Sequence, residues 1–201
     1  MGTRHKRAAR CIGCRLHEAH CICNTINPMA TRTRLTIIAH RRELKKTTNT
    51  GTLAAKTLSN SAVLSWGDEG TTLPPEIVVP APYRGLILAH DEPPLSVEAV
   101  ALALGPGPYC LVTPDGSWRQ ASKMARRIPA LAEMPRFSLP PGAPTRYLLR
   151  DEPKDGGLAT FEAIARALGI LEGPAIEEAM MAIFDALVAA TLTMRGQGAA
   201  T

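Results

Sequence analysis

Four of the five cysteines lie close together near the start of the chain, with the spacing C-x2-C-x6-C-x-C. They are Cys11, Cys14, Cys21 and Cys23. Four thiolates at short spacing are the ligand set of a tetrahedral structural zinc ion, and such a closed site leaves no open position for chemistry. Free thiols in a basic arm and an iron–sulfur cluster are the alternatives, although cluster ligands usually have other spacings. His17 and His20 are near enough to replace one cysteine as a ligand.

A second group of reactive side chains follows an apolar run in the middle of the chain. A carboxylate, a glycine, a hydroxyl, an indole and a guanidinium occur within five residues, 115–119. Gly116 allows a sharp turn or a close approach to a ligand. However, Asp115 or Ser117 can equally cap the helix that follows, and Trp118 can equally pack in a core. The residue types alone are therefore compatible with two interpretations of this segment: a reactive site or the ordinary start of a helix.

Apolar runs alternate with helical patterns, and this alternation predicts the scaffold that would position the 115–119 group. The predicted strands are 34–39, 86–89, 109–113 and 146–150. The predicted helices run from about 51 to 63 and over 97–104, 118–127, 160–168 and 176–194, with a loop over 67–82. Such alternation is typical of an α/β domain with a largely parallel sheet. Cys110, inside one predicted strand, is expected to be a buried small apolar residue.

Polar segments follow each of the predicted strands. They are residues 40–43, 90–94, 114–119 and 151–160. Ligands of parallel α/β sheets bind beyond the carboxyl ends of the strands, so these four segments are expected to meet at one edge. Metal binding would order residues 1–30, which hold too few apolar side chains to order themselves. We therefore expect a small zinc-binding segment over 1–30 and a larger domain over 31–201.

Charge is unevenly distributed along the chain. Residues 1–50 hold 11 basic and 2 acidic side chains, whereas residues 51–201 hold 12 basic and 16 acidic ones. The basic end suits a phosphate-facing surface, and a solubilising tail would have the same composition. The sequence contains no apolar run long enough to span a bilayer and no apolar signal segment near its start. We therefore expect a cytoplasmic protein whose cysteines do not form disulfides.

The 115–119 group carries a resemblance to a known family. The run from Asp115 to Trp118, D-G-S-W, resembles the D-x-T-W signature of DTW-domain proteins, with Ser117 at the position of the usual threonine. Residues 158–163 are similar to the L-S-T-x-E-A stretch of the same family.

Two further stretches extend this resemblance toward the start of the chain. Residues 11–23 are similar to the N-terminal cysteine cluster of the family. The stretch from His40 to Gly51 is similar to its H-P-x-E…N-T-G motif, with Arg41 in place of the proline. The matches keep their order and cover roughly residues 11–170.

The resemblance implies a tRNA-uridine aminocarboxypropyltransferase with a SPOUT-like, knotted α/β catalytic domain over residues 31–201. Such an enzyme moves the 3-amino-3-carboxypropyl group of S-adenosylmethionine to N3 of a tRNA uridine and releases methylthioadenosine. The expected partners are therefore tRNA and S-adenosylmethionine, with Zn²⁺ in the cysteine cluster. The uridine N3–H is a weak acid, so a carboxylate is expected to remove its proton, and Asp115 is the best candidate.

The expected site residues fall into three sets besides the four cysteines. The predicted catalytic residues are Asp115, Ser117, Trp118 and Arg119. The predicted cofactor-binding residues are His90, Thr113, Pro114, Gly116, Leu158, Thr160 and Glu162. The predicted RNA-binding residues are Lys45, Lys46, Lys123, Arg126 and Arg127, of which the last three share one helical face.

Two other functions fit the same residues. An RNA methyltransferase would use the same cofactor and would release S-adenosylhomocysteine. A zinc-bearing RNA-binding module without catalysis would depend on its cysteines and would tolerate the replacement of Asp115 by alanine.

Overall fold

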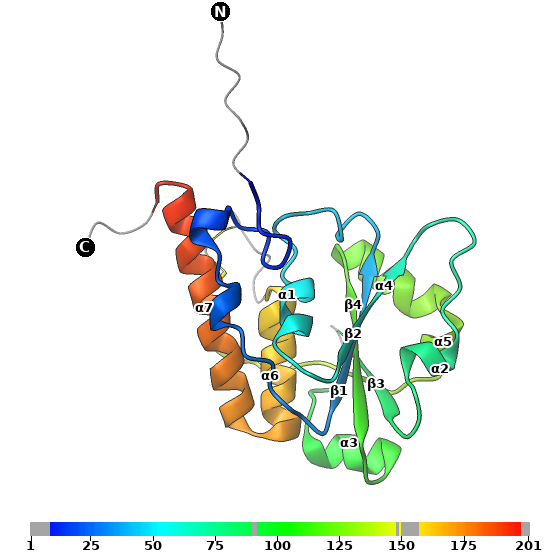
Figure 1. The fold of residues 1–201 in the computed structure, drawn as a ribbon. Helices are drawn as coiled ribbons and strands as arrows, with labels where there is room; N and C mark the ends of the chain where they lie inside the picture. The colour runs from blue at the N-terminus through cyan, green and yellow to red at the C-terminus, as the bar shows by residue number, and fades with distance from the viewer. Residues whose placement is uncertain (1–8, 90–91, 148, 150–156, 198–201) are drawn as a thin grey trace, which may run out of the picture.

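The computed structural model of the chain describes residues 9–89, 92–147, 149 and 157–197 (Figure 1). Five strands form one sheet in the order β2-β1-β4-β3-β5, and every neighbouring pair is parallel. The strands are β1 (Arg34–His40), β2 (Ser61–Trp66), β3 (Arg84–Leu88), β4 (Tyr109–Asp115) and β5 (Arg136–Phe137). This architecture confirms the predicted α/β class with a parallel sheet.

The two central strands are the most apolar parts of the chain. Residues 35–39 of β1 are buried without interruption, as expected for a strand covered on both faces. β4 lies beside β1 and pairs with it as far as Ala39 and Asp115. β3, on the other side of β4, pairs only as far as Ile87 and Val112. The carboxyl end of β4 therefore extends past the last paired residues of β3.

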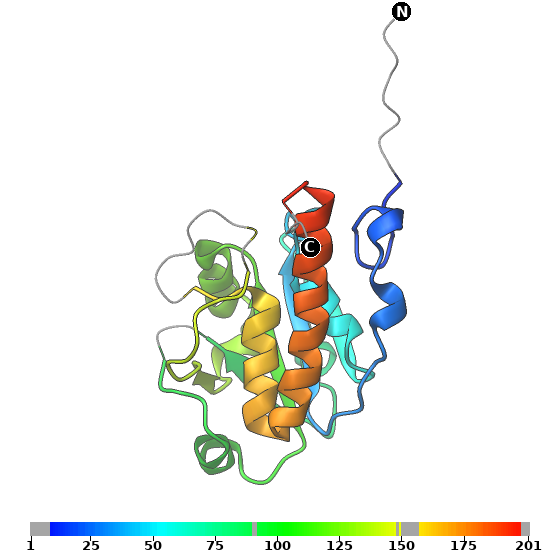
Figure 2. The ribbon, with the colours of Figure 1, turned by 90° about the vertical axis from the view of Figure 1, so that its left-hand side faces the viewer.

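Helices cover both faces of the sheet (Figures 1 and 2). They are α1 (Gly51–Lys56), α2 (Pro75–Val78), α3 (Val97–Leu104), α4 (Trp118–Arg127), α5 (Pro129–Ala132), α6 (Thr160–Glu172) and α7 (Pro174–Met194). Residues of α1, α6 and α7 share one apolar cluster with alternate residues of β1 and β4. Residues of α2, α4 and α5 form a second cluster on the opposite face, around Ile38 and Val112.

The cysteine segment, residues 9–30, packs against this body beside α7 (Figure 2). It contains two short 3-10 turns, η1 (Glu18–His20) and η2 (Cys23–Thr25). Three of its residues belong to the same apolar cluster as α1 and α7, and they are Cys14, Leu16 and Ile22. The segment therefore contributes to the common core, and a domain boundary after residue 30 stays a prediction.

The helix predicted over 51–63 is too long. The structure ends α1 at Lys56 and begins β2 at Ser61, where the hydroxyl donates to the carbonyl oxygen of Ala55 at 2.6 Å. That bond satisfies a carbonyl group at the end of the helix. The helical pattern predicted for Val63 is wrong because this residue lies on the edge strand of the sheet.

The strand predicted over 146–150 is also wrong where the structure describes it, because Arg146 and Tyr147 lie in irregular chain. The backbone N–H of Arg146 donates to the Glu162 carboxylate at 2.7 Å, and that of Tyr147 donates to the Thr145 hydroxyl at 3.0 Å. Side chains therefore satisfy the N–H groups that a strand would pair with a neighbour. Residues 148 and 150 lie outside the described part.

The bounds of the remaining longer elements agree with the predicted bounds to within a few residues. The helices α3 and α4 have the predicted bounds, and α2, α5 and β5 were not predicted. Among the described residues, no helix is both long and apolar enough to cross a membrane. The knotted, SPOUT-like topology stays a prediction.

Candidate active site and metal centre

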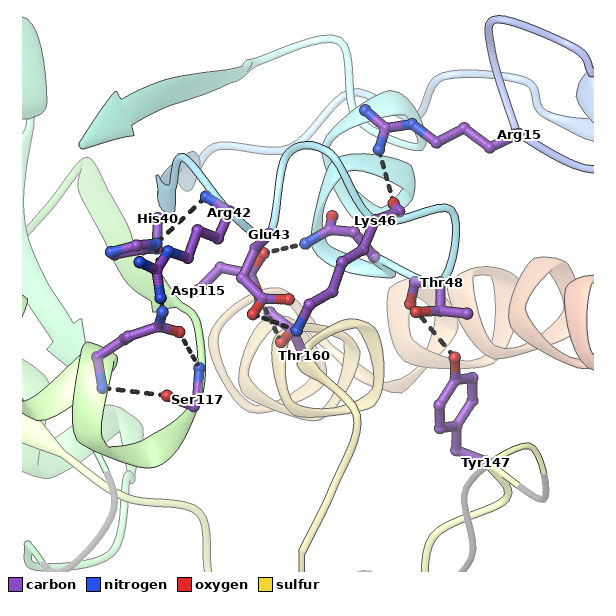
Figure 3. A network of polar contacts seen from close by, with 12 residues as sticks. Arg15, His40, Arg42, Glu43, Lys46, Thr48, Asp115, Ser117, Tyr147 and Thr160 are labelled. Atoms are coloured by element: carbon purple, nitrogen blue, oxygen red, sulfur yellow. Dashed lines mark hydrogen bonds and ion pairs between the residues drawn. The ribbon is translucent and has the colours of Figure 1, made fainter. Parts of the chain in front are cut away.

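Asp115 is the last residue of β4, and its carboxylate is held by two neutral donors (Figure 3). Asn49 donates from Nδ2 to Oδ2 at 2.5 Å, and Thr160 donates from its hydroxyl to Oδ1 at 2.7 Å. The residue is only 4% exposed. The loop before α1 and the start of α6 therefore converge on one buried carboxylate at the carboxyl edge of the sheet.

The segment 49–51 fits closely around this carboxylate. A side chain at Gly51 would place its Cβ 3.0 Å from Asp115 Oδ2, so the glycine permits the close approach. Asn49 also accepts the backbone N–H of Thr52 at 2.9 Å, which satisfies a free donor at the start of α1. The Thr50 hydroxyl accepts the N–H of Phe161 at 3.4 Å. The N-T-G, D-G-S-W and A-T-F-E stretches thus meet in space.

His40, at the end of β1, lies beside the same edge. Its Nδ1 accepts the backbone N–H of Arg42 at 3.2 Å and lies 3.3 Å from the side-chain nitrogen of Gln120. Two donors on Nδ1 place the ring proton on Nε2. Burial, followed by the charges of Arg42 and Arg41, lowers the pKa of His40 below its usual value. His40 is therefore neutral at physiological pH.

Ser117 is the N-cap of α4. The sequence had left open whether Asp115 or Ser117 caps this helix. Its hydroxyl accepts the N–H of Gln120 at 3.4 Å, and the Gln120 side chain accepts the N–H of Ser117 at 2.8 Å. A Cβ at Gly116 would come within 2.9 Å of the Gln120 Cβ, so the capping box needs the glycine. Asp115 does not cap α4, because its carboxylate is directed to Asn49 and Thr160.

The other predicted catalytic residues lie on the first turn of α4 and face outward. Trp118 is 50% exposed, which excludes the core-packing alternative, and Arg119 is exposed as well. An indole at this position offers a stacking surface at the same sheet edge as Asp115. Both side chains therefore reach the surface near the sheet edge that holds Asp115.

Thr113 has a buried hydroxyl close to Asp115 along β4. It lies two residues before Asp115, on the same face of β4, and is 5% exposed. Its hydroxyl has no hydrogen-bond partner in the part of the chain that the structure describes. Pro114, between them, has no N–H to pair, and it lies beyond the last pair that β3 makes with β4. The threonine hydroxyl is therefore enclosed by the protein, and its role in cofactor binding stays a prediction.

The remaining predicted cofactor residues differ in what they touch. Glu162 is fully buried and accepts hydrogen bonds from the Thr145 hydroxyl at 2.6 Å and from the N–H groups of Arg146 and Ala159. Its contacts fix the segment before α6. Leu158 is half-buried beside that segment. His90 lies outside the described residues.

The predicted RNA-binding residues are all exposed and come from two elements. Lys45 and Lys46 lie in the loop 41–50, and Lys46 forms an ion pair with Glu43 at 2.6 Å. The other three lie on α4, and they are Lys123, Arg126 and Arg127. Lys123 is near enough to the loop that its charge also lowers the pKa of His40. Cations of both elements therefore face the region around His40.

The four cysteines form the cluster that their spacing predicts. Their sulfur atoms all lie within 4.8 Å of one another. Cys11 and Cys23 are 3.5 Å apart at Sγ, and Cys14 and Cys21 are 3.7 Å apart. A tetrahedral zinc ion with bonds of about 2.3 Å requires sulfur atoms about 3.8 Å apart, so the donor set fits zinc. His17 instead lines a cavity of about 340 Å³ beside α7.

The backbone around the cluster is arranged for sulfur ligands. Gly13 N–H donates to Cys11 Sγ at 3.3 Å, and Cys23 N–H donates to Cys21 Sγ at 3.5 Å. Hydrogen bonds from the backbone of Cys14 and Gly13 lower the pKa of Cys11 to about 6, while burial raises that of Cys23 to about 12. A cation would allow all four thiols to ionise together.

Sequence reasoning missed three residues of the carboxylate site: His40, Asn49 and Gln120. His40 and Asn49 fall inside the H-x-x-E…N-T-G stretch, which was the signal that pointed to them. Gln120 had only a capping signal, three residues after Ser117.

Comparison with known proteins places the chain in a family. The DTW domain matches residues 8–192, so the chain belongs to the DTW-domain family. No solved structure matches.

Two characterised relatives carry the same kind of name. The chain is 24% identical over 215 aligned positions to tRNA-uridine aminocarboxypropyltransferase A of Arabidopsis thaliana, covering 92% of this chain and 81% of that protein. It is 38% identical over 66 residues to tRNA-uridine aminocarboxypropyltransferase 2 of Drosophila melanogaster. The second match covers 33% of this chain and 26% of the fly protein.

Proposed function

We propose that this protein transfers the 3-amino-3-carboxypropyl group of S-adenosylmethionine to N3 of a uridine in tRNA. Its family and the names of its relatives in Arabidopsis and Drosophila support this activity. The observation that carries the mechanism is the buried carboxylate of Asp115 at the carboxyl edge of the sheet, where α/β proteins bind their ligands.

Asp115 acts as the general base. A carboxylate offers about four acceptor positions, and Asn49 and Thr160 occupy two of them, so the others remain for the uridine N3–H. The two donors also fix the plane of the carboxylate, which directs the free positions away from α1 and α6. A proton on N3 then passes to an acceptor that is already oriented.

The residues at the end of β4 fit the cofactor. S-adenosylmethionine supplies, when bound, a carbon next to a sulfonium, and its neutral thioether leaving group needs no proton. Thr113 and Pro114 would lie beside it at the end of β4. Trp118 stacks on a base, and Arg119 holds a carboxylate or an RNA phosphate.

The atoms balance without a further reactant. The bond from N3 to carbon forms as the carbon–sulfur bond breaks, the electron pair goes to sulfur, and the N3 proton goes to Asp115. Which carbon of the cofactor reacts depends on how this chain orients it, because a methyl group on the same sulfur would give a methyltransferase.

The cysteine cluster plays a structural part in this proposal. A zinc ion held by four thiolates has no open position, so it orders the basic segment and does not touch the reacting atoms. Lys45, Lys46 and the cations of α4 bind tRNA phosphates. The activity belongs in the cytoplasm, where the thiols stay reduced.

Product analysis tests the proposal. Purified protein, S-adenosylmethionine and tRNA that lacks modifications are incubated, and the small molecules and tRNA nucleosides are separated and identified by mass spectrometry. Methylthioadenosine and an aminocarboxypropyl uridine are expected. S-adenosylhomocysteine with a methylated nucleoside would instead identify a methyltransferase, and tRNA binding without any product would identify a binding module.

A further inference from the structure

Arg15 directly follows the second cysteine of the cluster and has an unusual backbone. Its φ is +64°, the only positive φ of a non-glycine residue in the part of the chain described here. Its N–H donates to the carbonyl oxygen of Cys11 at 2.9 Å, and its own carbonyl oxygen accepts from Arg10 at 3.0 Å. Glycine would take this left-handed turn at less cost, so the arginine side chain needs another explanation.

That side chain reaches the loop 41–50, far along the chain (Figure 3). Its Nη1 donates to the carbonyl oxygens of Leu44 and Lys46, both at 2.7 Å. The Lys46 carbonyl oxygen also accepts the backbone N–H of Asn49 at 3.3 Å. Asn49 in turn donates from its side chain to Asp115 at 2.5 Å. A continuous series of hydrogen bonds therefore leads from the cysteine cluster to the buried carboxylate.

The loop depends on such contacts because it has little core of its own. Its side chains at positions 42 and 45–48 are exposed, and only Glu43 and Thr50 are buried. Besides the two bonds from Arg15, the Tyr147 hydroxyl donates to the carbonyl oxygen of Thr48 at 3.3 Å. Segments with few buried contacts open locally at low cost. Arg15 and Tyr147 thus bind the loop backbone from outside, in addition to the side-chain contacts of Arg41 with Asp68 and of Asn49 with Asp115.

We propose that Arg15 is a positioning residue, through which the cysteine cluster holds Asn49 against Asp115. The importance of Asp115 for transfer rests on the proposed function, but the mechanical link from Arg15 to the loop does not. Metal binding at the four thiols fixes the turn that carries Arg15. Removing the metal then loosens the loop 41–50.

Hydrogen exchange tests this link without any measurement of activity. Arg15→Gly removes the guanidinium and keeps the left-handed turn, and Arg32→Gly is the matched control, because the Arg32 side chain is 83% exposed. In Arg15→Gly, amide exchange across 41–52 is expected to rise on the order of tenfold, with zinc content and exchange in α6 unchanged. Arg32→Gly should leave exchange across 41–52 unchanged. Unchanged exchange in Arg15→Gly would overturn the proposal.

Metal removal and a double-mutant cycle complete the test. A chelator should raise exchange across 41–52 in the wild type and add little in Arg15→Gly. In single-turnover transfer, Arg15→Gly and Asn49→Ala should each slow the reaction without changing S-adenosylmethionine affinity, and the double variant should be no slower than Asn49→Ala. Independent, multiplying effects would contradict a role through Asn49. A wild type without transfer would refute the proposed function and leave the exchange result to decide the link.

Discussion

The cysteine segment and the Asp115 site each gather reactive side chains, but from very different distances along the chain. The four thiols come from residues 11–23, and local turns close the cluster. Asp115 instead takes its hydrogen bonds from Asn49 and Thr160, which are 66 and 45 residues away in sequence. The first site needs only its own short segment, whereas the second exists only when the whole sheet has formed.

The two sites also differ in how they compensate charge. Four thiolates within 4.8 Å require a cation, because neighbouring negative charges oppose ionisation. A single carboxylate can be stabilised by neutral donors, and Asn49 and Thr160 provide them. Loss of one cysteine should therefore abolish metal binding and with it the order of the cysteine segment. The Asp115 site, in contrast, should keep its shape when only the charge of the carboxylate is removed.

The largest effect expected from this difference is that of Asp115→Asn on the transfer rate. The amide keeps the shape, accepts from Asn49, and lets the Thr160 hydroxyl rotate to accept from it. The basic carboxylate is gone, so single-turnover transfer should fall on the order of a hundred- to ten-thousand-fold, with binding of both ligands nearly unchanged.

The pH dependence of that variant separates a base from a positioning group. Higher pH should partly restore transfer, because uridine N3 then ionises without help. A rate that stays low at high pH, with both ligands bound, would assign the carboxylate a positioning role. Transfer at the wild-type rate would remove Asp115 from the chemistry altogether.

The next largest effect concerns the metal. Cys14→Ser should abolish binding of about one zinc per chain and raise amide exchange across residues 9–30, since metal binding and folding of such a segment are coupled. Cys110→Ser is the matched control, because Cys110 is a fully buried thiol of β4 outside the cluster. Metal analysis and exchange are measured on both variants. Equal zinc content in Cys14→Ser and wild type would exclude the four-thiol site.

The sequence predicted the cysteine cluster better than it predicted the Asp115 site. The cysteine cluster was predicted in full, because short spacing within one segment carries enough information. Asp115 was predicted from the residues around it, but Asn49 was not, although both lie in recognised stretches. A contact across 66 residues depends on which strands become neighbours, and periodicity does not encode the order of strands.

The wrong strand prediction over 146–150 has a physical cause. The run from Tyr147 to Leu149 satisfies a strand pattern, yet Tyr147 is 5% exposed because it packs on Phe184 of α7, with ring centroids 5.7 Å apart. The buried Glu162 replaces the strand partner. Tertiary contacts overrode local propensity at this position, as they commonly do for short apolar runs.

A moderate effect is expected on tRNA binding from the charges near the Asp115 edge. Replacing Lys123 and Arg127 by glutamine should weaken binding and make the plot of log affinity against log salt shallower by about 1.5, for two lost phosphate contacts. Arg32 and Arg84 supply the matched pair, because Arg32 precedes β1 and Arg84 begins β3, at the opposite edge of the sheet. The tRNA affinity of both double variants is measured by binding titrations at several salt concentrations. Equal salt dependence of the two double variants would show that tRNA does not bind over Lys123 and Arg127.

The smallest effect concerns His40, which links the loop 41–50 to α4 at the Asp115 edge. Its pKa lies below 6.5 in the folded protein, mainly because of burial. The unfolded chain therefore binds a proton more readily, and protonation below about pH 6.5 favours unfolding. Stability should be full above that pH and should decline as the pH falls through the lowered pKa of His40.

His40→Asn isolates this contribution, because the amide oxygen can replace Nδ1 as the acceptor for Arg42 N–H and cannot take up a proton. The melting temperature of this variant should fall less than that of the wild type between pH 7.5 and pH 5, by a few degrees at most. Parallel curves for His40→Asn and wild type would show that His40 titrates alike in the folded and unfolded chains.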